Sequence, residues 1–194
     1  MVLLIPIRAL CTFLIITLAA CGAGTGTVYD KLDPLTAVTI TYSSTPLIFY
    51  RDNSGRAAYA REFLYLAPLE VNRTGTFRYY VWLGIWSTLQ DAGANEYRDG
   101  FESIVIYADG EPLPLALSGW TPESIGASEH IYTKPVASAA DAYFEVTADQ
   151  LRLIAASSNI RVQSTGIRPQ NYELWDEQLS ARESLRAFLL HSAF

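Results

Sequence analysis

Cys21 is the residue in this chain whose chemistry is easiest to place, because a thiol can be modified covalently. It ends the run LAAC (18–21), and the only charged side chain before it is Arg8. Residues 9–20 form an apolar segment with the length of the hydrophobic region of a signal peptide. Cys21 is therefore a modification site after a cleaved leader, the end of a membrane span, or an ordinary small core residue.

A retained membrane span is the main alternative to a cleaved leader. Residues 2–20 are about long enough to cross a hydrocarbon core of ~30 Å. However, Pro6 and Arg8 interrupt this stretch, and no basic cluster follows that would stop transfer. The sequence therefore favours a leader that is removed.

The run Leu18-Ala19-Ala20-Cys21 resembles the lipobox of bacterial lipoproteins. In that family the cysteine receives a diacylglyceryl group, and a peptidase then cleaves the chain just before it. The resemblance implies a signal peptide over 1–20 and lipid attachment at Cys21. Gly22 follows the cysteine, as in lipoproteins sent to the outer membrane. The expected location is the cell outer membrane, with the lipid-anchored protein facing the periplasm or the cell surface.

The cysteine count agrees with this interpretation. The chain has two cysteines, Cys11 and Cys21. Cleavage before Cys21 removes the first and acylation caps the second, so we expect neither a disulfide nor a cysteine metal site. Residues 21–35 are predicted to be the acylated N-terminus and a flexible tether that reaches at most ~45 Å.

Residues with catalytic potential form no recognisable set. The patterns G-x-S-x-G, S-x-x-K and H-E-x-x-H are absent, and neither His130 nor His191 can be paired with a nucleophile from sequence. One loop holds several oxygen ligands: Asp91, Asn95, Glu96 and Asp99. Their spacing does not match an EF-hand, which needs glycine where Glu96 stands. We predict a non-catalytic protein without a metal or cofactor.

An aromatic row on one predicted strand is the remaining candidate site. In residues 76–88, alternate positions separate a core row from a second face. The core row is Phe77, Tyr79, Val81, Leu83 and Ile85, and the second face is Arg78, Tyr80, Trp82, Gly84 and Trp86. Both faces are apolar, so something must cover the second one. Tyr80, Trp82 and Trp86 are either a binding face for a ligand or partner, with a gap at Gly84, or a second core layer.

The elements around this strand predict one domain over 36–194. Strands are predicted over 36–42, 47–51, 60–71, 101–108, 130–136, 142–147 and 160–165, with a hairpin turn at Asp109-Gly110. Capping boxes starting at Thr147 and Ser180 predict two late helices, the second of which could cover the aromatic row. The predicted fold is mostly β: an antiparallel β-sandwich with one or two helices near the C-terminus (β-rich α+β).

Charge and composition narrow the classes of partner. The net charge is −6 and no basic cluster occurs, so a nucleic-acid partner is disfavoured. We predict an envelope lipoprotein, held on the membrane through its lipid anchor, that acts as a protein-interaction or assembly module for an envelope partner. The alternative is a ligand-binding lipoprotein that holds a lipid, glycan or small apolar molecule on the aromatic face. An envelope hydrolase is the third hypothesis.

Overall fold

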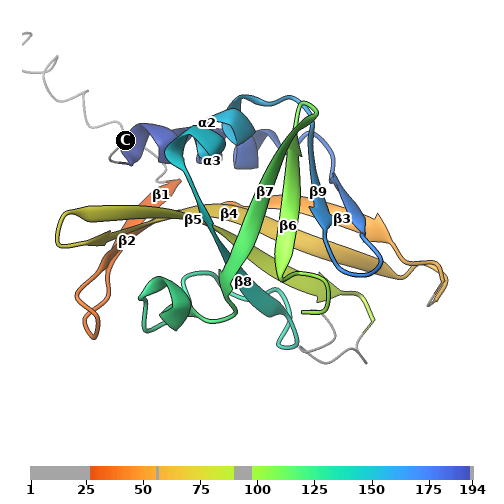
Figure 1. The fold of residues 1–194 in the computed structure, drawn as a ribbon, viewed down its shortest axis with the longest axis horizontal. Helices are drawn as coiled ribbons and strands as arrows, with labels where there is room; N and C mark the ends of the chain where they lie inside the picture. Colours follow the sequence, from red (N-terminus) through yellow and green to blue (C-terminus); the bar gives the residue numbers. More distant parts are fainter. Residues whose placement is uncertain (1–26, 56, 90–97, 193–194) are drawn as a thin grey trace, which may run out of the picture.

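The computed structural model describes residues 27–55, 57–89 and 98–192. Strands β1 to β7 come before the first helix, and the two α-helices come late in the chain (Figure 1). The strands are β1 (Val28–Leu32), β2 (Thr39–Ser43), β3 (Leu47–Asp52), β4 (Arg61–Arg73), β5 (Thr76–Ser87), β6 (Ser103–Ala108), β7 (Glu111–Gly119), β8 (Ala140–Val146), β9 (Ile160–Ser164) and β10 (Asn171–Leu174). The helices are the short 3₁₀-helix η1 (Pro122–Ile125), α2 (Ala148–Ala156) and α3 (Leu179–His191).

The sheet closes on itself, so the predicted β-sandwich is wrong. Eight antiparallel strands follow one another around a barrel in the order β4-β3-β10-β9-β6-β7-β8-β5, and β5 pairs again with β4. β1 and β2 extend the sheet beside the second half of β4. The predicted mostly-β composition with late helices is confirmed. A sandwich and a barrel share the same alternation of apolar residues, and only the closing strand pairs distinguish them.

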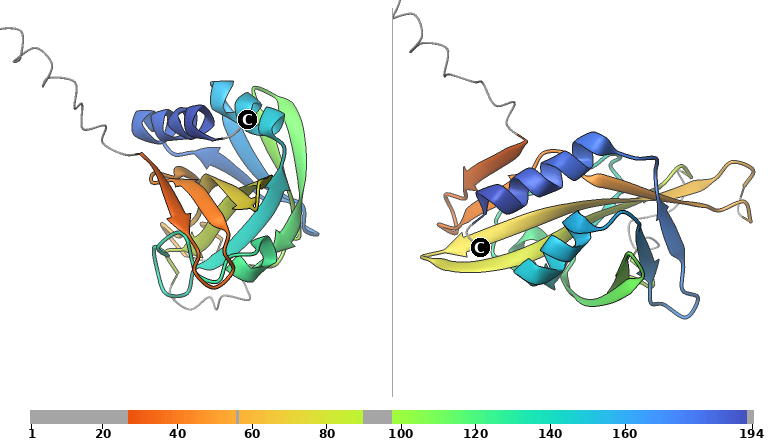
Figure 2. Two further views of the ribbon diagram at one scale, coloured as in Figure 1. Left: turned by 90° about the vertical axis from the view of Figure 1, so that its left-hand side faces the viewer. Right: turned by 90° about the horizontal axis from the view of Figure 1, so that it is seen from above.

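The two helices close one end of the barrel. α2 connects the end of β8 to the start of β9, and α3 follows the end of β10, so both lie at the same end (Figures 1 and 2). Leu151 and Ile154 of α2 join the barrel core, as do Leu185 and Phe188 of α3. The opposite end, where β4 begins and β5 ends, is left as the mouth of the barrel.

The helix starts confirm one of the two predicted capping boxes. Thr147 caps α2: its hydroxyl accepts from the backbone of Gln150, and the Gln150 side chain accepts from the Thr147 backbone. The second predicted box is wrong, because α3 begins at Leu179 after Gln178, which has a left-handed backbone and no side-chain cap. The Gln178 amide instead bonds the backbone of Ile48 on β3.

Strand β5 has two buried faces over residues 80–85, as its sequence predicts, but Phe77, predicted in the core row, lies near the start of the strand and is 39% exposed. Val81, Leu83 and Ile85 belong to the barrel core, while Tyr80 and Trp82 belong to a second core on the outside of the barrel. This outer core also contains residues of β2, β4 and β8. Residues 120–139, which include η1 and are called the covering segment below, cover this outer core. The C-terminal helix, which the sequence suggested as the cover, does not. Ile125 and Ala127 of this segment belong to the outer core.

Two predicted boundaries are also corrected. Residues 28–32, predicted as tether, form β1 and pair with β2. Residues 130–136, predicted as a strand, are irregular because they belong to the covering segment.

None of the helices described is both long and apolar enough to cross a membrane.

Candidate functional site

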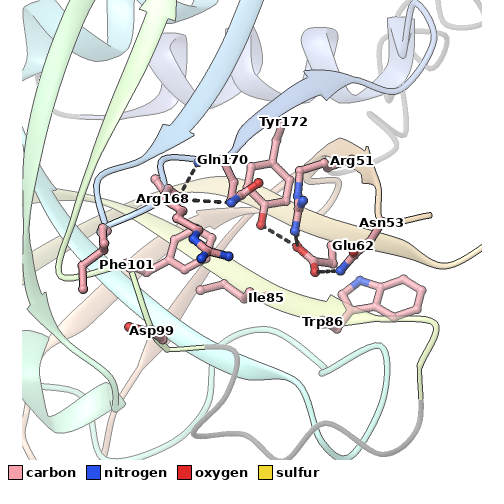
Figure 3. Close-up of a pocket in the computed structure, with 14 residues that line it drawn as sticks. Arg51, Asn53, Glu62, Ile85, Trp86, Asp99, Phe101, Arg168, Gln170 and Tyr172 are labelled. Atoms are coloured by element: carbon pink, nitrogen blue, oxygen red, sulfur yellow. Dashed lines mark hydrogen bonds and ion pairs between the residues drawn. The ribbon is translucent and has the colours of Figure 1, made fainter. Parts of the chain in front are cut away.

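A cavity of about 570 Å³ opens at the mouth of the barrel (Figure 3). This volume lies in the range of small-molecule sites, roughly 300–1,000 Å³. Its walls come from the ends of β3, β4 and β5, from the turn between β9 and β10, and from residues 99–101. Segments far apart in the sequence therefore meet at this one end.

A polar network projects inward at the mouth. Arg51 donates from Nε (3.2 Å) and Nη2 to Oε2 of Glu62, which also accepts from the Tyr172 hydroxyl at 3.0 Å. Asn53 donates to the other Glu62 oxygen at 2.6 Å. One carboxylate is thus held by three side chains from β3, β10 and the residue just after β3.

The network follows from the alternation of the strands. Leu47, Phe49 and Arg51 point to the same side of β3, because side chains two residues apart share a face. Glu62 stands two residues before the core residue Leu64 on β4. The inward rows of two strands therefore end in charged residues at the mouth, while deeper positions are apolar.

Burial and charge perturb the titration of this network. Burial raises the pKa of Tyr172 well above its ordinary value, and the adjacent Glu62 carboxylate raises it further. Burial lowers the pKa of Arg51, but the hydrogen bonds and charge of Glu62 more than offset that effect, so the net pKa is raised. Tyr172 stays a neutral donor and Arg51 stays a cation at physiological pH.

Apolar groups form another part of the wall. Ile85 and Phe101, both nearly fully buried, line the cavity below the polar network. Trp86 lines its edge beside Asn53 (Figure 3). The Trp86 ring stacks on Phe63 with centroids 4.6 Å apart and an interplanar angle of 17°. The cavity therefore offers both hydrogen-bonding and apolar surface.

The turn between β9 and β10 brings Arg168 and Gln170 to the cavity. The Ser164 hydroxyl accepts from the backbone of Gln170 at 3.0 Å. Gly166 packs on Gly100, where a Cβ added to Gly166 would lie 2.7 Å from the Gly100 Cα. Only glycine permits so close a backbone contact, which fixes the position of this turn against the barrel.

The predicted binding residues separate in the structure. Tyr80 and Trp82 are 3% and 1% exposed and lie under the covering segment, so they present no open surface. The Trp82 ring stacks on Tyr132 at 4.4 Å and lies over Gly84, filling the gap expected there. Of the three aromatic residues, Trp86 alone reaches the mouth cavity. Cys21 lies outside the described residues.

Two buried carboxylates hold the covering segment in place. Asp33, after β1, accepts from the Ser128 hydroxyl at 2.7 Å and from the Ser128 backbone at 2.5 Å. Asp141, on β8, accepts from Trp82 Nε1 at 3.0 Å, and its other oxygen is paired with His130 (3.0 Å) and Lys134 (3.3 Å). His130, whose side chain is 57% exposed, therefore contacts Asp141 from the solvent side of the outer core.

The other polar residues that the sequence singled out as candidates do not form one site. His191, in the last turn of α3, is 3.0 Å from Asp30 on β1. Asp99 lines the mouth cavity, whereas Asp91, Asn95 and Glu96 lie outside the described residues. Within the ranges that the structure describes, no group of three or more His, Cys, Asp or Glu side chains is placed to hold a metal ion.

Sequence reasoning missed Arg51, Glu62 and Tyr172. A usable signal was present for the first two: each continues an inward apolar row, after Phe49 and before Leu64. A charge in such a row marks either the end of the core or a buried polar site. No comparable signal marks Tyr172, because residues 168–172 read as a loop.

Comparison of the chain with protein-family models, with curated proteins and with solved structures finds no match.

Proposed function

We propose that this protein is a non-catalytic binding protein that holds a small molecule in the mouth of its barrel. The observation that carries the proposal is the Glu62 carboxylate, held by Arg51, Asn53 and Tyr172 on the wall of the 570 Å³ cavity. An eight-stranded barrel is just wide enough to be filled by side chains or to hold one small ligand. Here the deeper part is filled and the mouth is open.

The cost of the network supports a role in binding. Removing two charges from water is expensive, and well-packed apolar residues are often at least as stable as a buried ion pair. Tyr172 is 2% exposed and the side chains of Arg51 and Glu62 are 23% and 19% exposed, so part of this cost is present here. If this end of the barrel had only to be closed for stability, apolar side chains would be enough. Fixed polar groups beside apolar walls are what a ligand site requires.

We further propose that the barrel is anchored to the outer membrane through an acylated Cys21. This part rests on the lipobox resemblance. The intact mass of protein extracted from membranes, compared with a Cys21→Ser variant, tests it. Cleavage before Cys21 with added acyl chains is the expected mass; a full-length, unacylated mass contradicts it. The protein-interaction role expected from sequence stays a prediction, and the mouth cavity favours ligand binding.

Ligand-observed NMR of the full chain in detergent, with a library of small acidic, basic and neutral compounds, tests the binding function. The test variant is Arg51→Met/Glu62→Leu/Tyr172→Phe, which replaces the whole network by apolar groups. The control is Arg61→Met, on the same strand as Glu62 but paired with Asp52 on the outside.

We expect wild type and control to bind a common set of compounds and the triple variant to lose them while remaining folded. The proposal is overturned if wild type binds nothing in the library, or if the folded triple variant binds the same set.

A further inference from the structure

We propose that the ligand of the mouth carries a single carboxylate, received between the guanidinium groups of Arg51 and Arg168. This inference rests on the proposed function and specifies the chemistry of its ligand. It follows from which hydrogen-bonding groups of the cavity are already used and which remain open.

Glu62 has little capacity left for a ligand. One of its oxygens accepts from Arg51 and Tyr172, and the other accepts from Asn53. The oxygen that accepts from Asn53 keeps one lone pair, but Arg51 already balances the charge of the carboxylate. The network therefore does not select for a cationic ligand.

Arg51 has N–H donors that Glu62 does not use. A guanidinium carries five N–H groups in a fixed fork. Glu62 receives hydrogen bonds from Nε and Nη2 of Arg51, so three of the five N–H groups, two of them on Nη1, make no hydrogen bond to Glu62. Because Glu62 holds the guanidinium on one edge, the orientation of these donors is set before a ligand arrives.

Arg168 supplies a second guanidinium on the same cavity. Figure 3 shows its side chain directed into the cavity from the β9–β10 turn. Among the described side chains, none forms an ion pair with it. The turn that carries it is held by the Gly100–Gly166 contact and by the Ser164–Gln170 hydrogen bonds. Arg168 is therefore an available cation on a fixed turn.

The charges of the described lining side chains sum to zero, and it is their placement that favours a ligand with a single negative charge. Among the described side chains, four charged ones line the cavity: the cations Arg51 and Arg168 and the anions Glu62 and Asp99. Arg51 and Glu62 neutralise each other, and Figure 3 shows Asp99 away from that pair. A guanidinium matches the two oxygens of a carboxylate. A doubly charged phosphate would meet repulsion from Glu62 and Asp99, and among the described lining side chains Arg168 is the one cation without an ion pair to offset it.

The body of the ligand would contact the apolar wall. Phe101 and Ile85 are 4% and 3% exposed and line the cavity beside the polar network. A ring or short chain attached to the carboxylate can cover this surface. An aromatic ring and a sugar ring can both stack on apolar surface of this kind. The experiment therefore includes one matched pair of each.

Isothermal titration of the full chain with matched pairs tests the inference. The pairs are 3-phenylpropionate with its amide, and glucuronate with glucose. We expect at least one acid to bind about tenfold more tightly than its neutral partner, as a charge-assisted hydrogen-bonding pair allows. Arg168→Gln should remove this preference, and Arg168→Lys should restore part of it.

Arg161→Gln is the matched control, because Arg161 lies over the Tyr107 ring at 4.4 Å on β9 and does not line the mouth. It should leave both affinities unchanged. Equal binding of acid and neutral partner, lost in the Arg51→Met/Glu62→Leu/Tyr172→Phe variant, would overturn the carboxylate inference and leave the proposed function standing. The carboxylate inference is likewise overturned if none of the four compounds binds while other compounds of the library bind in the mouth. If no compound of the library binds, the proposed function itself fails.

Discussion

Trp82 donates a hydrogen bond from its indole nitrogen to Oδ1 of Asp141, 3.0 Å away and across the β5–β8 pair. The other oxygen of Asp141 holds His130 and Lys134. A single carboxylate therefore joins the outer core of the barrel to the segment that covers it.

Replacing Asp141 should destabilise the protein strongly. Its side chain is 2% exposed, so Asp141→Ala leaves the buried Trp82 N–H without a partner and removes the contacts of Asp141 with His130 and Lys134. A buried donor left without a partner costs about 1–3 kcal/mol of unfolding free energy, and the loss of the contacts with the more exposed His130 and Lys134 adds to it. Urea unfolding measures this cost. The control is Asp52→Ala, which breaks the ion pair of an aspartate whose side chain is 65% exposed, and it should change the unfolding free energy little. Equal losses of unfolding free energy in the two variants would refute the role of Asp141.

Gly84→Ala should disturb the same outer core by overpacking. An added Cβ would lie 2.7 Å and 2.8 Å from two atoms of the Trp82 ring. The ring cannot move aside, because it is fully buried and bonded to Asp141. We expect a loss of about 1–3 kcal/mol in thermal or urea unfolding. Gly55→Ala, where an added Cβ meets nothing within 4 Å, is the control, and similar losses would show that the clash is relieved.

Acid should loosen the covering segment through Asp33. The backbone N–H of Ser128, with further hydrogen bonds from the Ser128 hydroxyl and the backbone of Leu35 and Thr36, holds the pKa of Asp33 well below its ordinary value. A depressed carboxylate pKa contributes stability above the unfolded value of about 3.9, and this contribution is lost as the pH falls towards the folded value.

The wild-type unfolding free energy should therefore drop as the pH falls below about 4. Asp33→Asn should be less stable at neutral pH and should show a shallower drop in acid. Asp149→Asn, at an exposed site on α2, is expected to follow wild type. Parallel pH profiles for wild type and Asp33→Asn would contradict the assignment.

The mouth is expected to face away from the membrane if the predicted anchor is correct. The chain enters the domain at the closed end, where the Ser184 hydroxyl of α3 donates to the Thr27 carbonyl at 3.2 Å. With no cysteine beyond Cys21, Ile167→Cys at the mouth and Leu190→Cys on α3 each give one labelling site, both highly exposed. A lipid-borne quencher should quench a fluorophore at 190 more than one at 167. The reverse order would contradict this orientation.

Sequence and structure agree where local pattern decides the outcome. The alternation on β5 correctly separated two buried faces, and the Thr147 capping box correctly placed the start of α2. The Asp109-Gly110 hairpin is confirmed, with both residues at positive φ as a tight two-residue turn requires. Each of these features depends on residues close together in the chain.

The barrel and its mouth depend on long-range pairing, which one sequence does not reveal. Closure needs β5 to pair with both β4 and β8 and β10 to pair with β3. The same pairings bring Arg51, Glu62 and Tyr172 together. The cover of Trp82 was misassigned for a related reason: the covering segment has no regular pattern, whereas the amphipathic C-terminal helix does.

Fluorine NMR of the full chain labelled with 5-fluorotryptophan tests the central claim most directly. The chain has four tryptophans, of which Trp86 lines the mouth cavity while Trp82 is buried in the outer core. Single Trp→Phe variants assign the signals. Titration with a compound that binds should shift the Trp86 signal saturably and leave the Trp82 signal in place. A saturable shift at Trp82 without one at Trp86 would place the ligand outside the mouth and contradict the account.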